Sequence, residues 1–390
     1  MKIAVVCDSF KGSLTSKDAC AAVKDGLLRC NKNFEVLSLP FADGGEGTSR
    51  CFYDILGGQL RKAAVHDPLL REITAEYTVL PDGTAVIDIA SASGLTLLKS
   101  SERDAVKVSS LGSGELICDA AEHGAKHIIL GLGGSATTDA GTGILYALGM
   151  RFFSEDGVEV LPDGQNMIRV KKIRRTENFE RFKDIKFTLA CDVTNPLCGE
   201  NGAAYVFSPQ KGASKNDVKL LDDGLRNIVE IFEKASGKKI INLPGAGAAG
   251  GIGGGLSAFL NCELQSGFDV LARAASLEDK IRRSDAVITG EGKTDRQTLF
   301  GKLPKRVSDI AEKFGVPCIL LSGDVENDIS AEKLGVCEIH KIKENGISLE
   351  HCMKNAASLL SEKAFAIGKN SKIINKQYSR KQEKMRENER

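Results

Sequence analysis

The chain has 390 residues, of which 42% are hydrophobic and 27% are charged, and its net charge at pH 7 is +1. This length fits two domains with ordinary cores, and the balanced charge gives no reason to expect nucleic acid or an anionic membrane as a partner. The 11 cysteines form no C-x-x-C pair, which indicates a reduced protein rather than a disulfide framework or a zinc knuckle. No apolar run approaches the ~18 residues of a membrane helix. We therefore expect a cytoplasmic protein that binds small molecules.

The first 65 residues show the pattern of a strand, a helix and a second strand. Residues 3–7 form a continuous apolar run, residues 16–30 place apolar side chains at helical spacing, and residues 34–39 read as a strand again. Thr15 and Asp18 have the form of a capping box. This pair predicts that the helix begins directly after Thr15.

From residue 66 the pattern changes to short strands joined by turns. Strand-like runs flank residues 81–83 and, further along, an acidic turn at Gly157, which predicts two hairpins in a mixed sheet. After a glycine-rich run near residue 250, strand and helix patterns alternate again, at residues 286–288, 305–314, 318–321 and 349–367.

These patterns predict an α/β protein of two domains. One is a Rossmann-like parallel α/β domain built from both termini, residues 1–65 plus 285–370, and the other is an inserted mixed-sheet α/β domain, residues 66–284. The place of residues 110–150 stays open, because they have the pattern of a parallel α/β unit. Residues 371–390 are rich in charge and lack apolar periodicity, so we expect a disordered tail there.

Five polar loops that contain glycine follow or adjoin strand-like runs, which is where open α/β sheets bind ligands. The first loop carries Asp8, Ser9 and Lys11 just before a helix N-terminus, a suitable place for phosphate. The second carries Asp43 and Glu46 among glycines that let the backbone approach a ligand closely. It suits a metal or the hydroxyls of a polyol, and a surface turn is the alternative.

The third loop, residues 131–141, combines glycines and hydroxyls between a strand and a helix. Its exposed N–H groups form a candidate phosphate cradle, with these members: Gly133, Gly134, Ser135 and Thr137. The fourth loop carries Asp192 and Asn195. Partial desolvation by apolar neighbours would raise the pKa of Asp192 and suit it as a general base, whereas a turn or a helix cap is the alternative.

The fifth loop mixes acids with basic residues after a strand. Glu291 and Asp295 suit Mg²⁺, and Gly292 and Lys293 suit phosphate oxygens. The loop resembles the end of a Walker A motif, but Val287 stands where the first glycine of that motif belongs, so a P-loop fold is not expected. All five histidines lie outside the five loops. Acids, lysine and glycine remain, and these are the groups that phosphoryl transfer uses.

The glycine run from Gly245 to Gly250 matches the G-x-G-x-x-G pattern of dinucleotide-binding proteins, with Asp269 about twenty residues later. The glycines that follow would weaken the required helix by roughly 1 kcal/mol each relative to alanine. We therefore interpret the run as a glycine-rich ligand or hinge loop, in which Gly247 and Gly250 contact phosphate. A nicotinamide-dependent oxidoreductase that uses this loop is an alternative, and a non-catalytic ligand-binding protein is another.

The segments 8–14, 42–48 and 131–137 resemble the signature segments of type I glycerate kinases, the bacterial glycerate 2-kinases and 3-kinases. The resemblance continues in family order and covers residues 1–368, with further blocks at residues 190–199, 207–213, 245–251 and 288–298. Thr138-Asp139-Ala140 departs from the Asn-Asp-Gly run that is common in the family. The resemblance implies a two-domain α/β fold and phosphorylation of D-glycerate by ATP with Mg²⁺, with 2-phosphoglycerate favoured over 3-phosphoglycerate.

Combined with the loop chemistry, this resemblance leads to a specific division of roles. We predict that Asp192 deprotonates a glycerate hydroxyl and that Lys11 offsets charge on the transferred group. Asp295, together with Glu291, is predicted to bind Mg²⁺. The glycine-rich loops are predicted to hold ATP phosphates or the substrate carboxylate. The residues predicted to contact the substrate are Asp8, Ser9, Asp43, Glu46 and Asn195.

Overall fold

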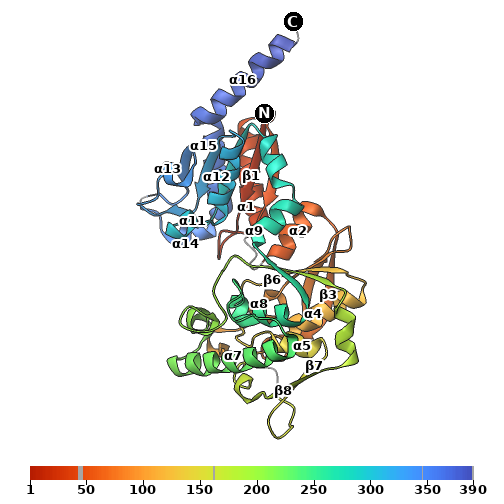
Figure 1. The fold of residues 1–390 in the computed structure, drawn as a ribbon. Coiled ribbons are helices and arrows are strands. Elements are labelled where there is room, and N and C mark those ends of the chain that lie inside the picture. Colours follow the sequence, from red (N-terminus) through yellow and green to blue (C-terminus); the bar gives the residue numbers. More distant parts are fainter. Residues whose placement is uncertain (43–46, 161–162, 345, 389–390) are drawn as a thin grey trace. The chain divides into compact units, whose positions relative to one another are not determined.

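The computed structural model describes residues 1–42, 47–160, 163–344 and 346–388, with side chains described up to residue 380. The chain divides into two compact units (Figure 1): unit 1 consists of Met1–Asp43 and Leu271–Arg390, and unit 2 is Gly44–Val270. These borders differ from the expected ones at residues 65 and 285. The reason is that α2 (Thr48–Leu56) packs on the sheet of unit 2, whereas α10 (Leu277–Arg282) packs on a helix of unit 1.

The sheet of unit 1 has five parallel strands in the order β15-β13-β11-β1-β2. The chain runs from β1 outward to β2 and then returns to the other side of β1 with β11, so the strand order reverses between β1 and β11. In open α/β sheets, ligands bind at the carboxyl ends of the strands at such a reversal. The strands are β1 (Lys2–Cys7), β2 (Glu35–Pro40), β11 (Ala286–Gly290), β13 (Cys318–Ser322) and β15 (Glu338–Lys341).

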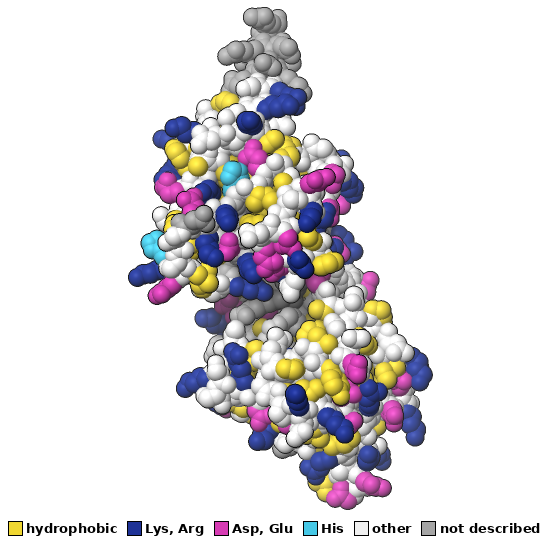
Figure 2. All heavy atoms as spheres, turned by 90° about the vertical axis from the view of Figure 1, so that its left-hand side faces the viewer, with side chains coloured by type: hydrophobic (Ala, Val, Ile, Leu, Met, Phe, Trp, Pro, Cys, Tyr) yellow, Lys and Arg dark blue, Asp and Glu magenta, His cyan; other side chains and the backbone are white. Residues whose placement is uncertain are grey.

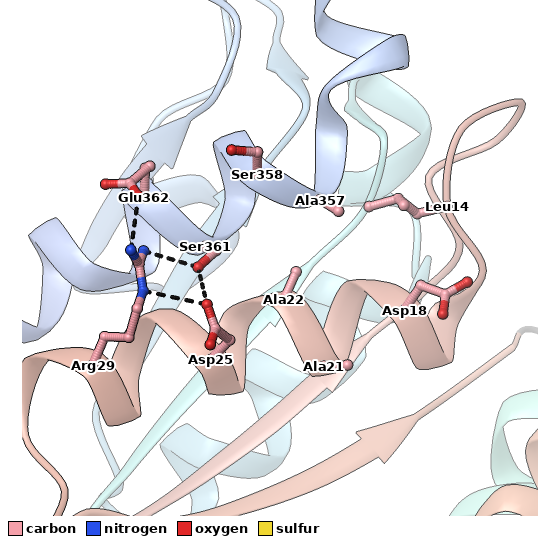
Figure 3. Close-up of a pocket in the computed structure, with 10 residues that line it drawn as sticks. All are labelled: Leu14, Asp18, Ala21, Ala22, Asp25, Arg29, Ala357, Ser358, Ser361 and Glu362. Atoms are coloured by element: carbon pink, nitrogen blue, oxygen red, sulfur yellow. Dashed lines mark hydrogen bonds and ion pairs between the residues drawn. The ribbon is translucent and has the colours of Figure 1, made fainter.

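Helix α1 (Ser16–Cys30) packs closely on α15 (Ala356–Asn370) in unit 1. A Cβ at Gly26 would lie 2.0 Å from the carbonyl oxygen of Ser361, so only glycine allows the two backbones to approach this closely. Figure 3 shows Arg29 of α1 reaching the α15 side chains, with hydrogen bonds of 2.9 Å to Glu362 and 3.0 Å to Ser361. The predicted N-cap is confirmed, because Thr15 Oγ1 accepts a 3.1 Å hydrogen bond from the Asp18 N–H, and the Asp18 carboxylate accepts one of 2.6 Å from the Thr15 hydroxyl.

The C-terminal part of unit 1 departs from the sequence expectation in two places. The single helix expected over residues 349–367 is two helices, α14 (Leu349–Lys354) and α15, because the chain leaves helical geometry at Asn355 with φ −109° and ψ 17°. The expected disordered tail contains α16 (Lys372–Asn388). Its first turns are held by two apolar side chains: Ile374 is fully buried, and the ring of Tyr378 meets the ring of Phe34 edge to face at 5.9 Å.

The remaining helices of unit 1 flank the sheet and its loops. Among them, α12 packs on β11 and β13, and α11 is a single turn that follows the fifth polar loop. Their bounds are α11 (Arg296–Leu299), α12 (Leu303–Lys313) and α13 (Ala331–Leu334), and α9 (Gly267–Ala274) crosses the border between the units.

The sheet of unit 2 is mixed, in the order β10-β9-β6-β5-β4-β3. Strands β3, β4 and β5 pair antiparallel, and β5, β6, β9 and β10 pair parallel. The observed parallel sheet from both termini and the mixed sheet from the inserted segment confirm the predicted fold class. The strands are β3 (Gln59–His66), β4 (Glu72–Val79), β5 (Ala85–Asp88), β6 (His127–Gly131), β9 (Lys186–Ala190) and β10 (Asn261–Gln265).

The hairpin expected around Gly157 is present but short: the Ser154 N–H donates a 2.9 Å hydrogen bond to the Val158 carbonyl, and the Val160 N–H donates one of 2.8 Å to the Phe152 carbonyl. Strand β7 (Met150–Phe153) pairs over four positions with β8 (Lys172–Arg175), and only one isolated bridge, Phe153 to Glu159, joins it to the expected partner. Pairing with β8 accompanies the burial of Phe152 against the core of unit 2, which the nearby sequence pattern does not encode. The helices of unit 2 are α2, α3 (Ala90–Ser93), α4 (Leu111–Glu122), α5 (Thr142–Ala147), α6 (Ala203–Phe207), α7 (Lys215–Ser236) and α8 (Ala248–Phe259).

Each unit has its own apolar core. On the face shown in Figure 2, basic and acidic side chains are interspersed, in keeping with the net charge of +1. Within the described residues, none of the helices is both long enough and apolar enough to span a membrane.

Candidate active site

A cavity of about 590 Å³ opens in unit 1 at the reversal of strand order between β1 and β11. It brings together six residues that the sequence predicted from two different loops: Asp8, Ser9, Lys11, Glu291, Gly292 and Lys293. Asp295, the first predicted metal ligand, is not among the lining residues. The loops after β1 and β11 therefore meet at one site, as expected for the carboxyl ends of neighbouring parallel strands.

Close backbone packing positions these two loops. The Asp8 N–H donates a 2.9 Å hydrogen bond to the carbonyl of Gly290, which joins the ends of β1 and β11. A Cβ at Gly292 would lie 3.1 Å from the Cα of Phe10, and one at Gly323 would lie 2.1 Å from the carbonyl oxygen of Gly292. Glycine is thus needed at Gly323 for the backbone to pass this closely.

Four lysines line the cavity, and their ionic partners differ. Lys293 pairs with Glu326 at 2.8 Å, Lys302 with Asp295 at 3.3 Å, and Lys343 with Asp324 at 2.7 Å. Lys11 has no hydrogen-bond or ion-pair partner among the described residues. Lys11 is therefore the cation of this set whose charge is available to a ligand.

Part of the cavity lining is apolar, and sequence reasoning missed it. The side chains come from the segment after β15, from α14 and from the start of α15: Ile342, Leu349, Cys352, Met353 and Ala356. No local motif marks these residues, because four of them fit ordinary helix periodicity and Ile342 follows a strand-like run. A cavity lined by both lysines and apolar side chains suits a ligand that has both a polyanionic and a flat apolar part.

The two acids predicted for Mg²⁺ lie in different surroundings. Glu291 is buried and accepts a 2.6 Å hydrogen bond from Thr298 Oγ1, and burial raises the pKa of its carboxyl group. Asp295 caps α11 by accepting a 2.9 Å hydrogen bond from the Gln297 N–H. Burial raises the pKa of Asp295, but Lys302 and the cap outweigh it, so the net shift is downward.

The described residues include no group of three or more acids, histidines or cysteines that could hold a metal alone. Mg²⁺ is commonly bound by only one or two carboxylates together with substrate phosphates and water. The acids of unit 1 therefore fit a Mg²⁺ ion that is bound with a nucleotide and do not form a closed metal cage.

The third predicted loop follows β6 in unit 2 and is fixed at both sides. The carbonyl of Ser93 accepts a 2.8 Å hydrogen bond from the Ala136 N–H, and the carbonyl of Gly134 accepts one of 2.9 Å from the Leu95 N–H. Gly134 is exposed and Ser135 is buried. Thr137 is fully buried, and its hydroxyl has no hydrogen-bond partner within the described structure.

Lys211 contacts this loop through its ammonium group. The sequence reasoning did not single it out. It is 3% exposed, and its ammonium group donates hydrogen bonds of 2.8 Å to Ser135 Oγ and 2.6 Å to the Thr137 carbonyl. Burial lowers the pKa of Lys211 to about 7, although the nearby charge of Asp139 acts in the opposite direction. The only sequence signal was its place in the 207–213 block of the family resemblance.

The glycine run 245–251 packs against the third and fourth predicted loops. A Cβ at Gly247 would lie 2.2 Å from the carbonyl oxygen of Pro196, and one at Gly250 would lie 2.1 Å from that of Thr137. The glycines therefore satisfy a packing requirement, and phosphate contact at Gly247 and Gly250 stays a prediction. The dinucleotide fingerprint is wrong, because the residues before Gly245 form turns and no strand, and Gly250 has a left-handed φ of 70°.

The fourth loop, after β9, leaves Asp192 exposed. The expected desolvation of Asp192 is thus not supplied by the residues around it in unit 2. Asn195 holds the loop in place, because its side-chain amide donates a 2.9 Å hydrogen bond to the carbonyl of Asn201. The other two predicted substrate contacts, Asp43 and Glu46, lie outside the described residues.

Comparison with known proteins adds independent information. The sequence model of the glycerate kinase family matches residues 3–372. A glycerate kinase of Halalkalibacterium halodurans is 38% identical over 364 residues, which cover 93% of this chain and 96% of that protein. Glycerate 2-kinase of Escherichia coli is 41% identical over 330 residues, 84% of this chain and 87% of that protein. A crystal structure of a protein provisionally assigned as glycerate kinase 2 from Salmonella typhimurium LT2 superposes with a TM-score of 0.84 at 35% identity, and the match covers 94% of this chain and 97% of that one.

Proposed function

Because the chain belongs to the glycerate kinase family, we propose that it transfers the γ-phosphoryl group of ATP to the 2-hydroxyl of D-glycerate and so forms 2-phosphoglycerate. Family membership confirms the resemblance seen in the sequence, and with it the general activity: the chain is a glycerate kinase, a phosphotransferase. The choice of the 2-hydroxyl is supported by the name of the Escherichia coli relative at 41% identity.

The observation that most supports ATP as the donor is the cavity of unit 1. Its apolar lining residues, from Ile342 and α14, fit the nucleobase, and its lysines fit the phosphates. Lys11 is the lysine there for which the described residues supply no carboxylate partner, so the nucleotide phosphates would supply its counter-charge. We assign Lys293 and Gly292 to the phosphate chain as well.

Asp192 is our candidate general base. Its carboxylate would take the proton of the glycerate hydroxyl as that oxygen attacks the γ-phosphorus, and the bond between the γ-phosphorus and the bridging oxygen would break to release ADP. Lys11 would offset the negative charge that accumulates on the transferred group. In this proposal Asp8, Ser9, Asp43, Glu46 and Asn195 orient the substrate.

A magnesium ion bound with ATP would neutralise charge on the β- and γ-phosphates. Glu291 lines the cavity and Asp295 lies four residues further along the same loop, so these two acids stay our candidates for binding it. Because the pKa of Glu291 is raised by burial, a bound cation would favour its ionised form. Glu291→Gln should therefore raise the Mg²⁺ concentration required for half-maximal rate.

The test is an assay of ADP formation from ATP and D-glycerate, with the phosphate position of the product determined by phosphorus NMR. We expect 2-phosphoglycerate; exclusive formation of 3-phosphoglycerate would overturn the regiochemistry alone. Asp192→Asn should lower kcat at least 100-fold, the usual scale of general-base catalysis. Asp184→Asn, which changes an exposed acid of the same unit, is the matched control, and near-normal turnover of Asp192→Asn would reject the base assignment.

A further inference from the structure

Lys211 is a buried cation that no carboxylate of the described residues neutralises by direct contact. It is 3% exposed, and among the described residues its only hydrogen-bond partners are the Ser135 hydroxyl and the Thr137 carbonyl, both neutral. Removing an ammonium group from water costs several kcal/mol unless a counter-charge compensates it. A buried lysine next to a glycine-rich loop therefore indicates that an anion binds at that loop.

The loop from Gly133 to Thr137, which Lys211 contacts, and Lys211 itself have hydrogen-bond donors that no described acceptor uses. The ammonium group has three donors and uses two of them. Ser135 Oγ accepts from Lys211, so its own proton is available for another acceptor. The backbone N–H groups of Gly133, Gly134 and Ser135 have no acceptor within the described part of the chain. The buried hydroxyl of Thr137 is also unpartnered there.

Lys211 is held firmly in this position. It ends a single 3-10 turn, Pro209–Lys211, and the next residue, Gly212, has a φ of 96°. A Cβ at Gly212 would lie 2.3 Å from the Arg103 carbonyl oxygen, so the turn is packed against that backbone. Ser208, just before the turn, is hydrogen-bonded to Thr138 at 2.9 Å, which ties the lysine segment to the loop a second time.

We propose that Lys211 is a positioning residue that makes the loop from Gly133 to Thr137 an oxyanion site, which holds either the carboxylate of glycerate or the phosphoryl group being transferred. This inference rests on the proposed function, because both anions belong to the glycerate kinase reaction. Lys211 acts through Ser135 and through the local positive charge. The burial that lowers its pKa to about 7 is compensated when the anion binds, since a nearby negative charge favours the ammonium form.

The experiment uses the full chain and the Lys211→Met variant, which keeps the length of the side chain and removes its charge. Binding of D-glycerate and of its uncharged amide is measured by calorimetry, and kcat is measured with saturating ATP. If the loop holds the carboxylate, the wild type binds glycerate at least tenfold more tightly than the amide, and the variant loses this preference. If it holds the transferred phosphoryl group, the preference stays and kcat falls at least tenfold.

Two further variants keep the test decisive. Lys219→Met removes an exposed lysine of α7 and should change neither quantity. Should Lys211→Met fail to fold, Ser135→Ala retains the lysine, and it should reduce either the preference or kcat by severalfold. The inference is overturned if the wild type phosphorylates glycerate while the folded variants keep both the preference and kcat. Absence of ADP formation by the wild type would instead reject the proposed function.

Discussion

At the scale of single residues, the structure separates lysines that the sequence could not tell apart. Lys11, Lys293 and Lys302 all line the same cavity, but only Lys11 lacks a carboxylate partner among the described residues. Lys211 differs from all three because it is buried in unit 2. Since a lysine already paired with an acid contributes less to binding an anion, the unpaired Lys11 and the buried Lys211 are the ones whose loss should matter most.

Lys11→Met should lower kcat/KM for ATP at least tenfold, which corresponds to ~1.4 kcal/mol of transition-state stabilisation. The reason is that the variant removes the uncompensated charge in the cavity. Steady-state kinetics with varied ATP measures the effect, and Lys24→Met on the exposed side of α1 serves as the control. Equal kinetics for the two variants would show that Lys11 is a solvated surface charge.

Burial of Lys211 should make stability depend on pH. Its pKa is lowered from 10.5 to about 7, so between these values the unfolded chain binds more protons than the folded one. The free energy of unfolding contributed by this group therefore rises with pH across that window, by at most about 1.4 kcal/mol per pH unit. Below pH 7 both states are protonated and the dependence disappears.

Urea unfolding followed by far-UV circular dichroism at pH 7, 8 and 9 checks this. As pH rises, the unfolding free energy of the wild type should increase relative to that of Lys211→Met. The difference in unfolding free energy between wild type and Lys219→Met should stay constant. A flat difference for Lys211→Met would mean that the lysine is solvated well enough to keep its ordinary pKa.

At the scale of secondary-structure elements, the start of α8 is built by contact between backbones. Ala249, Gly250 and Gly251 have left-handed φ values of 53°, 70° and 95° inside the span of the helix. The Ala140 N–H donates a 3.0 Å hydrogen bond to the Gly250 carbonyl. The glycine run thus packs against the third loop and stabilises it. Only glycine allows this approach, because a Cβ at Gly250 would overlap the backbone of Thr137.

Gly250→Ala should therefore destabilise the protein by more than 2 kcal/mol, an order-of-magnitude figure typical of overpacking combined with backbone strain. Gly237→Ala is the matched control, because Gly237 has nearly the same φ of 72° but nothing within 4 Å of its added Cβ. It should cost only the strain, about 1 kcal/mol. Urea unfolding of both variants measures the difference, and equal losses would refute the role of the contact with Thr137.

Local sequence patterns predict helices with strong periodicity well, and they predict poorly which strands pair with each other. The first helix was expected over residues 16–30 and α1 is Ser16–Cys30, because Thr15 and Asp18 supply the cap locally. The pairing of β7 with β8 was missed, since strand pairing between distant segments depends on which segment the fold brings alongside. The break between α14 and α15 was also missed, because it lies at an ordinary asparagine without proline or glycine to mark it.

At the scale of the whole molecule, the candidate groups are divided between the two units. Unit 1 holds the lysine-rich cavity, and unit 2 holds the loop from Gly133 to Thr137 with Lys211 behind it. A kinase needs one place for the nucleotide and one for the acceptor. In our proposal the nucleotide binds in unit 1 and an anionic group of the reaction binds at the loop of unit 2, while Asp8 and Ser9 of unit 1 also contact glycerate. The ligand response of each unit is therefore measured separately.

Hydrogen exchange followed by mass spectrometry tests this assignment. A non-hydrolysable ATP analogue should slow amide exchange in residues 8–13 and 342–356, and D-glycerate alone should slow exchange in residues 131–137. Residues 215–236 of α7, which contribute to neither site, give the internal reference. Protection of residues 131–137 by the ATP analogue alone, with residues 8–13 unchanged, would reverse the assignment.

The sequence by itself determined the α/β class, the discontinuous first domain, the loops that hold acids, lysine and glycine, and the family. These follow from local periodicity, from the chemistry of short segments and from their order along the chain. The tertiary structure decided which lysines are unpaired, which side chains form the apolar wall of the cavity, and why Gly250 must be glycine. It also placed Lys211 behind the third loop. Burial and pairing arise from residues far apart in the sequence, so they exist only once the sheets are assembled.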